Sequence, residues 1–246
     1  MSAVSLREAA SGVVQITMED REHKNLFSRA LIGGLMRAFD AAAGSDCRVV
    51  VLTGYDNYFA SGGTREDLLS LHAGAGQFTD ASIYSLPLRC DVPVIAAMQG
   101  HGIGGGFVLG LFADCVVLSR ESVYTANFMK YGFTPGMGAT LIVPRKLGIA
   151  LAEEMLLSAR SYRGGDLEKR GVPFPVLPRG EVLPYALALA RDMAEKPRLS
   201  LVALKRHLVH DLRARLADTV QREVGMHEQT FSQPEVGDRI RASFGR

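Results

Sequence analysis

Cysteine is scarce in this sequence: its 246 residues include three, at Cys47, Cys90 and Cys115. An odd number cannot all form disulfides within the chain, and no two of them have the C-x-x-C spacing of many redox and zinc sites. The sequence therefore gives no reason to expect disulfide chemistry or a cysteine-bound metal. We expect three reduced core residues, as in a protein of the cytoplasm.

Long apolar runs and a strong net charge are also lacking. No stretch approaches the ~20 apolar residues of a membrane span, and the first residues, MSAVSLREAASGVVQ, have no apolar signal core behind a basic start. The formal net charge of +2 does not by itself suggest a nucleic-acid or membrane partner. With 47% hydrophobic and 22% charged residues, the composition is that of a globular protein. We expect a cytoplasmic protein that acts on a small or carrier-bound substrate.

The first half of the chain alternates apolar runs with helical patterns. The runs at 13–18, 48–53, 93–98 and 115–119 predict buried strands. Between them, the segments 29–43 (capped by Ser28), 65–71, 79–86 and 104–112 predict helices. This alternation favours an α/β architecture with parallel strands.

Helical patterns dominate after about residue 135. We predict helices at 138–147, 149–158, 181–195, 199–210 and 211–231. The expected organisation is therefore an α/β core over residues 1–178, followed by a C-terminal helical region over residues 179–246.

Two glycine-rich segments carry the candidate chemistry. They are YFASGGTREDL, from Tyr58 to Leu68, and MQGHGIGGGFVLG, from Met98 to Gly110. Each leaves a predicted strand and enters a predicted helix, and glycine allows the turn between them to point a free backbone amide at a ligand. Two amides that converge on one point would form an oxyanion hole.

Simpler interpretations exist for each segment taken alone. A single glycine-rich turn before a helix is more often a plain chain reversal. The second segment also matches the dinucleotide-binding pattern G-x-G-x-x-G at Gly100, Gly102 and Gly105. Because it does not belong to an opening βαβ unit, that interpretation is not favoured.

The two segments together resemble the crotonase (enoyl-CoA hydratase/isomerase) superfamily, as do PGMGAT from Pro135 and EHKNLF from Glu22. The resemblance covers essentially the whole chain. It implies a crotonase-type ββα superhelix core, usually assembled as a trimer or a dimer of trimers. The C-terminal helical region would then serve in trimerisation and complete the active site.

The resemblance also implies roles for particular residues. The backbone N–H groups of Gly63 and Gly105 would be the two oxyanion donors. Lys24 and Leu26 would lie in the basic, Asn-containing loop that the family keeps near the CoA carrier.

The chain departs from the hydratases of this superfamily at two positions. Those enzymes hold and activate water with two glutamates, and the matching residues here are Val108 and Phe128. Neither apolar side chain can act as a general base. Hydration is therefore not expected, and an apolar pocket with an oxyanion hole suits a reaction through an enolate that water would spoil. Val108 and Phe128 are expected to line the substrate pocket and keep water out.

A narrower resemblance fits this departure. ASGGT from Ala60, AMQGHGIGGG from Ala97, VYTANFMKYGFTPGMG from Val123 and MHE from Met226 resemble the crotonase-fold decarboxylases of polyketide β-branching cassettes. Those enzymes follow an HMG-synthase-like enzyme and a dehydratase, and convert a 3-methylglutaconyl group on an acyl carrier protein into 3-methylcrotonyl. The resemblance implies that His227 faces the substrate and protonates the dienolate. It also implies an acyl carrier protein and the other cassette enzymes as partners.

The same resemblance implies that no metal or redox cofactor is needed, because the thioester is the electron sink. The substrate carrier would be the phosphopantetheine thioester of an acyl carrier protein, or CoA. Two alternatives remain open at this point: an enoyl thioester isomerase, which also passes through a dienolate, and a non-catalytic crotonase-fold scaffold of a synthase.

One further departure concerns the departing carboxylate. Members of the subfamily meet it with a lysine in the loop after the first glycine motif, but this chain has no lysine between Lys24 and Lys130. Gln77 falls near the expected position, and Arg65 and His72 are the other polar candidates. A neutral amide can hydrogen-bond a carboxylate but cannot pair its charge.

The remaining histidines have simpler interpretations. His23, His72, His207 and His210 are expected to be solvated, and His101 to pack behind the second glycine turn.

Overall fold

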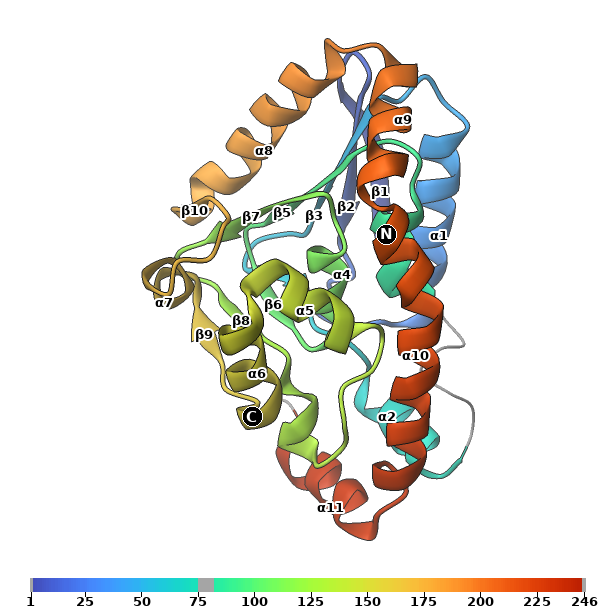
Figure 1. Cartoon of the computed structure of the whole chain (residues 1–246), viewed down its shortest axis with the longest axis vertical. Helices are drawn as coiled ribbons and strands as arrows, with labels where there is room; N and C mark the ends of the chain where they lie inside the picture. Colours follow the sequence, from blue (N-terminus) through green and yellow to red (C-terminus); the bar gives the residue numbers. More distant parts are fainter. Residues whose placement is uncertain (1, 75–81, 245–246) are drawn as a thin grey trace.

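The computed structural model describes residues 2–74 and 82–244, whose strands form two sheets (Figure 1). The larger sheet has the strand order β1-β2-β3-β5-β7-β10. β1 pairs with β2 in the antiparallel sense, and every other neighbouring pair in this sheet is parallel. The strands are β1 Val4–Ala10, β2 Val13–Met18, β3 Val49–Thr53, β5 Val94–Met98, β7 Cys115–Ser119 and β10 Val176–Leu177.

The four apolar runs are confirmed as β2, β3, β5 and β7, whereas β1 was not predicted. β1 is an edge strand with an exposed centre, and of its residues only Val4 is fully buried. An edge strand with one solvated face contains no continuous apolar run, so its sequence does not stand out.

The core lies on both faces of the larger sheet. Val49 and Val51 of β3 face α8 (Arg179–Ala194), whose buried residues Val182 and Ala186 pack against them. The opposite face belongs to a larger cluster that includes α1 (Arg29–Ala43) and α4 (Gly105–Leu111). In Figure 1, α8 and α1 lie on opposite sides of this sheet. Because both faces are covered, β3 and β5 are buried at every residue.

The smaller sheet was not predicted from the sequence because its strands are very short. Its order is β4-β6-β8-β9, with parallel pairing except for the antiparallel β8–β9 pair. The strands are β4 Tyr58–Ala60, β6 His101–Ile103, β8 Val123–Thr125 and β9 Tyr162–Arg163. β4, β6 and β8 follow β3, β5 and β7 in turn, and each pair leads into a helix. This repeated ββα unit is the expected superhelical core.

The helical segments were predicted more closely than the short strands. Ser28 caps α1, where its Oγ accepts a hydrogen bond from the Leu31 N–H at 3.1 Å. The predicted helix at 79–86 lies partly outside the described residues, and from residue 82 on the chain forms a 3₁₀ turn and a short helix instead. These and the other first-half helices are α2 Arg65–His72, η1 Ser82–Ser85, α3 Leu86–Arg89 and η2 Asn127–Tyr131.

The second half is mostly helical, as expected. The five predicted segments correspond to α5, α6, α8, α9 and α10, while α7 and α11 were not predicted. The bounds are α5 Ala139–Leu147, α6 Ile149–Ser158, α7 Gly164–Lys169, α9 Arg198–Leu208, α10 His210–Thr230 and α11 Pro234–Ser243. None of the helices in the described ranges is long and apolar enough to span a membrane.

Candidate active site

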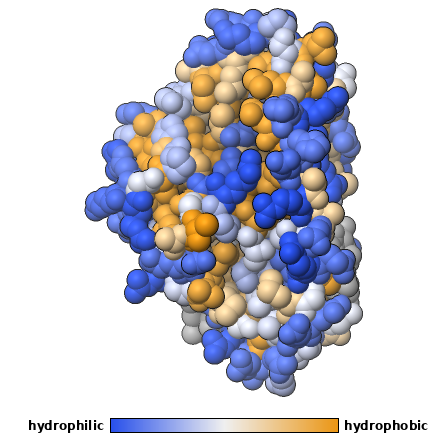
Figure 2. All heavy atoms as spheres, viewed as in Figure 1, coloured by the Kyte–Doolittle hydropathy of each residue, from blue (hydrophilic) through white to orange (hydrophobic). Residues whose placement is uncertain are grey.

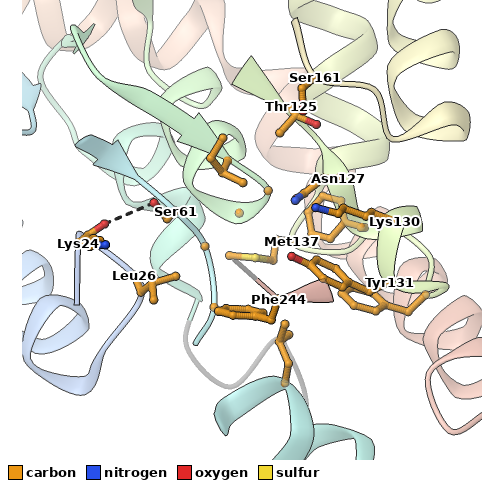
Figure 3. Close-up of a pocket in the computed structure, with 18 of the residues that line it drawn as sticks. Lys24, Leu26, Ser61, Thr125, Asn127, Lys130, Tyr131, Met137, Ser161 and Phe244 are labelled. Carbon is orange, nitrogen blue, oxygen red and sulfur yellow. Dashed lines mark hydrogen bonds between the residues drawn. The ribbon is translucent and has the colours of Figure 1, made fainter. Parts of the chain in front are cut away.

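A cavity of about 430 Å³ opens where the two glycine segments meet η2 (Figure 3). Five of the residues expected at the site line it: Lys24, Leu26, Gly63, Gly105 and Phe128. They come from the loop before α1, the turn after β4, the turn after β6, and η2. Residues far apart in the sequence therefore share one cavity.

The two glycine turns touch each other through their backbones. Gly62 and Gly104 have positive φ angles of 73° and 54°, which side-chain-bearing residues rarely adopt. A Cβ atom added to Gly62 would lie 3.1 Å from the Gly105 nitrogen, and one added to Gly106 would lie 2.1 Å from the Ala60 carbonyl oxygen. Glycine is therefore required here because any side chain would push the two segments apart.

The amides of Gly63 and Gly105 are available at this junction. Among the described residues, neither donates a backbone hydrogen bond. Gly105 is the first residue of α4, so its N–H has no partner within the helix. Both residues line the cavity, so both amides can serve a bound ligand.

The loop that carries Lys24 and Leu26 is held in place by Asn25. Its side chain is fully buried, accepts a hydrogen bond from the Asp20 N–H at 2.8 Å, and donates to the carbonyls of Met18 at 3.0 Å and Phe59 at 2.8 Å. These bonds tie the end of β2 to β4, directly before the first glycine turn. Together with the backbone bonds from the Ser61 N–H to the Asn25 carbonyl and from the Phe27 N–H to the Gly62 carbonyl, this side chain fixes the loop at the cavity.

Replacing Asn25 by alanine tests this anchor. Asn25→Ala leaves two buried carbonyls and one N–H without partners, so we expect the free energy of unfolding to fall by about 2–4 kcal/mol in urea denaturation. Asn57→Ala is the matched control, because within the described residues Asn57 accepts the His101 N–H through its backbone carbonyl, which alanine keeps. It should change stability by less than ~0.5 kcal/mol. Equal stability of both variants would contradict the anchoring role.

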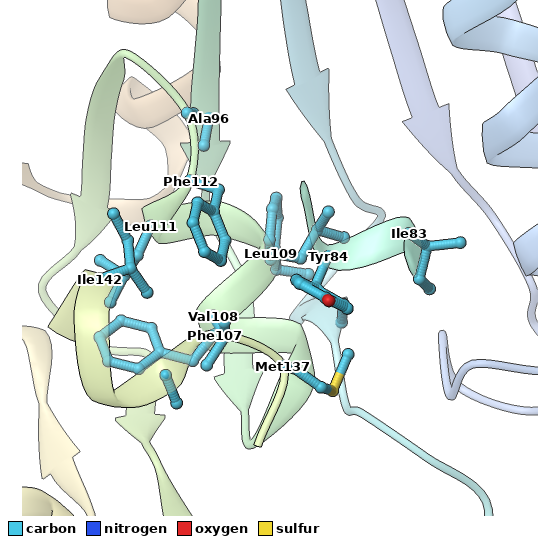
Figure 4. Packing of buried hydrophobic residues seen from close by; sticks show 14 of the residues in the cluster. Ile83, Tyr84, Ala96, Phe107, Val108, Leu109, Leu111, Phe112, Met137 and Ile142 are labelled. Atoms are coloured by element: carbon cyan, nitrogen blue, oxygen red, sulfur yellow. The ribbon is translucent and has the colours of Figure 1, made fainter. Parts of the chain in front are cut away.

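The two residues expected to stand in place of the hydratase glutamates lie in different parts of the structure. Phe128 is in the cavity wall, where its ring packs edge-on against Phe133 at 6.2 Å between centroids. The expectation that Val108 lines the substrate pocket is wrong: it is fully buried in the core with Leu109 and Leu111 of α4 (Figure 4). α4 is short and apolar on every side, so its side chains beyond the first turn pack into the core.

His227 lies behind the described wall. It projects from α10, and its Nε2 lies 2.6 Å from the Thr134 carbonyl oxygen. Because a carbonyl can only accept, Nε2 carries a proton. The imidazole meets Phe133, a wall residue, edge-on at 6.1 Å between centroids. Burial lowers the pKa of His227, while the bond to Thr134 partly opposes this shift.

The other histidines lie away from the wall. His101 packs behind the second turn, as expected, and its Nδ1 accepts a hydrogen bond from the Val123 N–H at 2.9 Å. Burial lowers the pKa of His101. His72 corrects the expectation of a solvated ring: it is half-buried, and its Nδ1 lies 2.6 Å from the Phe231 carbonyl oxygen. It ties α2 to the end of α10, a contact between segments that local sequence cannot indicate.

The remaining polar candidates have different outcomes. His207 and His210 are exposed, as expected, whereas His23 is half-buried with its Nδ1 3.0 Å from Asp20 Oδ1. Arg65 is exposed and donates to the Arg241 carbonyl oxygen at 3.3 Å rather than lining the cavity. Gln77 lies outside the described residues.

Sequence reasoning missed Glu223, which organises the segment next to the cavity. This buried carboxylate on α10 accepts hydrogen bonds from the Gly138 N–H at 2.7 Å, the Thr140 N–H at 2.9 Å and the Thr140 hydroxyl at 2.6 Å. It thereby caps α5 from another helix and holds Met137 against the second glycine turn. Burial raises the pKa of Glu223 above its usual value.

Sequence reasoning also missed part of the cavity wall, namely Asn127, Lys130, Tyr131 and Phe244. The first three belong to η2. They fall within the segment that resembles the decarboxylases. The sequence of this segment has no periodic apolar pattern, so it did not predict the 3₁₀ helix that directs these side chains to one cavity.

Comparisons with known proteins show which family the chain resembles. The enoyl-CoA hydratase/isomerase family matches residues 8–242. The chain is 62% identical over 245 residues to the bacillaene synthase decarboxylase PksI of Bacillus subtilis, with 99% of this chain and 98% of that protein aligned. Such a match covers the cavity and all the elements around it.

Solved structures show the same relationship. One, from a dehydratase/decarboxylase enzyme couple involved in polyketide β-branching, superposes with a TM-score of 0.98 at 62% identity, covering 99% of this chain and 96% of that chain. The ECH2 decarboxylase domain of CurF from Lyngbya majuscula superposes with a TM-score of 0.96 at 48% identity, covering 99% and 100% of the two chains. With the family match over nearly its whole length, the chain belongs to the enoyl-CoA hydratase/isomerase family.

Proposed function

We propose that this protein is a decarboxylase of polyketide β-branching, which converts a 3-methylglutaconyl thioester into 3-methylcrotonyl. The observation that carries the proposal is the 62% identity to a named decarboxylase over 99% of the chain. The site adds chemical support, because Gly63 and Gly105, whose amides have no backbone acceptor among the described residues, line one cavity together with the apolar Phe128. These findings do not favour an isomerase or a non-catalytic scaffold.

The amides of Gly63 and Gly105 would stabilise the charge that develops on the thioester oxygen. The bond between C4 of the acyl chain and the carboxyl carbon breaks, and carbon dioxide leaves. The electron pair enters the conjugated system as a dienolate, whose negative charge is largest on that oxygen. Donors fixed in a cavity that excludes water stabilise such charge more strongly than water does.

His227 would supply the proton that forms the new C–H bond. A neutral imidazole has one N–H, and in His227 it is already directed at Thr134. The imidazolium has a second N–H on Nδ1. We therefore assign donation to the protonated ring, with Thr134 orienting it.

The carrier in this proposal is the phosphopantetheine arm of an acyl carrier protein, with CoA as the simpler analogue. Lys24 and Leu26 border the cavity on the side of the loop before α1 (Figure 3), where they would contact the arm. No metal or redox group is required, because the thioester accepts the electron pair.

The proposal includes a homotrimer or a dimer of trimers in the cytoplasm, working with the other enzymes of the cassette. Apolar surface among α5, α6, α8 and α9 is visible in Figure 2. Ile149, Leu157 and Leu199 are exposed at 69%, 76% and 80%. Burial of such side chains against a second copy would favour assembly. The three cysteines are free thiols, as suits a reducing compartment.

The test follows 3-methylglutaconyl loaded onto an acyl carrier protein, with product mass measured by mass spectrometry and double-bond position by NMR. Loss of carbon dioxide supports decarboxylation. A product of unchanged mass but shifted double bond would indicate an isomerase, and unchanged substrate would indicate a scaffold.

Hydration provides a separate prediction. Because no glutamate occupies position 108 or 128, we expect no measurable addition of water to crotonyl thioesters. An authentic enoyl-CoA hydratase assayed in parallel provides the positive control. Turnover near that of the control would mean that another residue activates water in this cavity.

A further inference from the structure

The cavity wall is unusual in its charge. Among the described residues that line it there is no aspartate, glutamate or histidine, and the cationic side chains are Lys24 and Lys130. Figure 3 shows these two lysines on opposite sides of the cavity. The described part of the wall therefore carries cationic side chains at two separated places.

The geometry of η2 explains why Lys130 belongs to the wall. In a 3₁₀ helix, side chains three residues apart lie one above the other. Asn127 and Lys130 form one such pair, and Phe128 and Tyr131 form the other. All four line the cavity, so this short helix directs a cation, an amide and a phenol to the same space.

Tyr131 is placed to donate a hydrogen bond within that space. Its side chain is 8% exposed and stacks between Phe133 and Phe244, with centroids 6.0 Å and 6.1 Å away. Among the described residues no hydrogen bond reaches its phenol, and its oxygen is not among the buried atoms left unsatisfied. The phenol therefore opens to the cavity that the residue lines.

The chemistry of this phenol suits an anion. Burial raises the pKa of Tyr131, so it stays protonated and can only donate to a carboxylate near neutral pH. The Lys130 Nζ lies 5.9 Å from the centroid of the same ring, which brings a positive charge to the same wall. A hydrogen bond to a charged acceptor is stronger than one between neutral groups.

We propose that Lys130 and Tyr131 form the subsite for the substrate's carboxylate. This inference rests on the proposed function, which supplies a thioester with a free carboxyl group at its far end. If the carrier arm enters beside Lys24 and the thioester oxygen lies at the two glycine turns, the acyl chain runs toward η2.

Lys130 and Tyr131 contribute differently to binding of the carboxylate. Lys130 is exposed, so water screens its charge and the ion pair is weak. Tyr131 lies in an apolar aromatic stack and sets the position of the carboxylate. Weak charge pairing suits the reaction, because strong stabilisation of the ground-state carboxylate would raise the barrier to its loss.

The experiment compares two unreactive ligands that differ by the carboxyl group. They are the phosphopantetheine thioesters of 3-methylglutarate and isovalerate. The first is saturated, so it has no conjugated path for an electron pair and keeps its carboxylate. The readout is the ratio of their dissociation constants, measured by calorimetry for each variant.

Wild-type protein should bind the 3-methylglutaryl thioester more tightly. Tyr131→Phe, which keeps the aromatic stack, should reduce this preference by about 10- to 100-fold. Lys130→Gln should reduce it by about two- to fivefold. The matched controls Tyr58→Phe and Lys24→Gln alter the other phenol and the other lysine of the wall, and should leave the ratio unchanged.

Several results would overturn the subsite. The first is equal binding of both ligands by the wild-type protein, and the second is an unchanged ratio of dissociation constants in Tyr131→Phe and Lys130→Gln. The third is equal weakening of both ligands by Lys130→Gln, a result that would assign this lysine to the carrier phosphate. The proposed function is judged separately, by release of carbon dioxide from the 3-methylglutaconyl substrate. A wild-type protein that prefers the carboxylated ligand yet releases no carbon dioxide would keep the subsite and reject the decarboxylase.

Discussion

His227→Ala is expected to slow formation of the decarboxylated product by about 10²–10⁴-fold, the usual contribution of general acid catalysis. The reason is that the dienolate must be protonated at carbon, and this imidazole adjoins a wall residue of the cavity. Single-turnover reactions followed by mass give the rate directly. His210→Ala, on the same helix but exposed, is the control and should react at the wild-type rate.

The dependence of the reaction rate on pH should also show that His227 is the proton donor. Because the protonated ring is the donor, the rate should fall as the pH rises through the pKa of His227, which burial places below its ordinary value. The rate should therefore be higher on the acidic side of neutrality, and this slope should disappear in His227→Ala.

Gly136 offers a second way to disturb the imidazole. A Cβ atom at Gly136 would lie 2.6 Å from His227 Cε1 and 3.1 Å from its Nε2. Gly136→Ala should therefore displace the ring from Thr134 and slow the reaction. If it acts only through His227, the double variant should be no slower than His227→Ala.

Gln77→Ala tests whether the loop after the first glycine motif contributes as much to the reaction rate as His227 does. An uncharged hydrogen bond contributes about 0.5–1.5 kcal/mol, so its loss should cost roughly tenfold at most. Wild-type activity in His227→Ala together with an inactive Gln77→Ala would move the chemistry from α10 to that loop.

Gly63→Pro should reduce kcat by about 10²–10³-fold, because it removes one of the two oxyanion donors. Proline lacks the backbone N–H, whereas alanine keeps it. Gly63→Ala is therefore the matched control. Its Cβ would approach Leu68 no closer than 3.6 Å, an ordinary contact, so it should fold and react close to wild type.

Thermal unfolding of both variants separates loss of the donor from loss of the fold. If Gly63→Pro melts near the wild-type temperature and keeps full kcat, this amide is not a donor. If Gly63→Ala is as slow as Gly63→Pro, the space at this turn matters rather than the N–H.

Local patterns in the sequence were sufficient for much of the framework. The continuous apolar runs predicted β2, β3, β5 and β7, since strands buried on both faces need apolar residues at every position. Ser28 predicted the start of α1 because a capping hydroxyl acts on an amide three residues away. The glycine spacing predicted which residues would meet at the cavity, because only glycine permits the approach of Gly62 to Gly105.

Other features depend on partners that are distant in the sequence. The exposed edge strand β1 and the short strands of the second sheet are defined by hydrogen bonds to other strands rather than by their own composition. Glu223 resembles any helical glutamate until α10 is placed beside α5, 83–85 residues earlier in the chain. Its role therefore has no local signature.

The sequence by itself determined the fold family and the two glycine turns, because these depend on residue type and short spacing. Only the tertiary structure decided which side chains reach the cavity. It placed Val108 in the core, His227 behind Phe133, and Lys130 and Tyr131 in the wall. The direction of a side chain follows from how its helix packs against the others, and that packing is the sum of many long-range contacts rather than a property of any one segment.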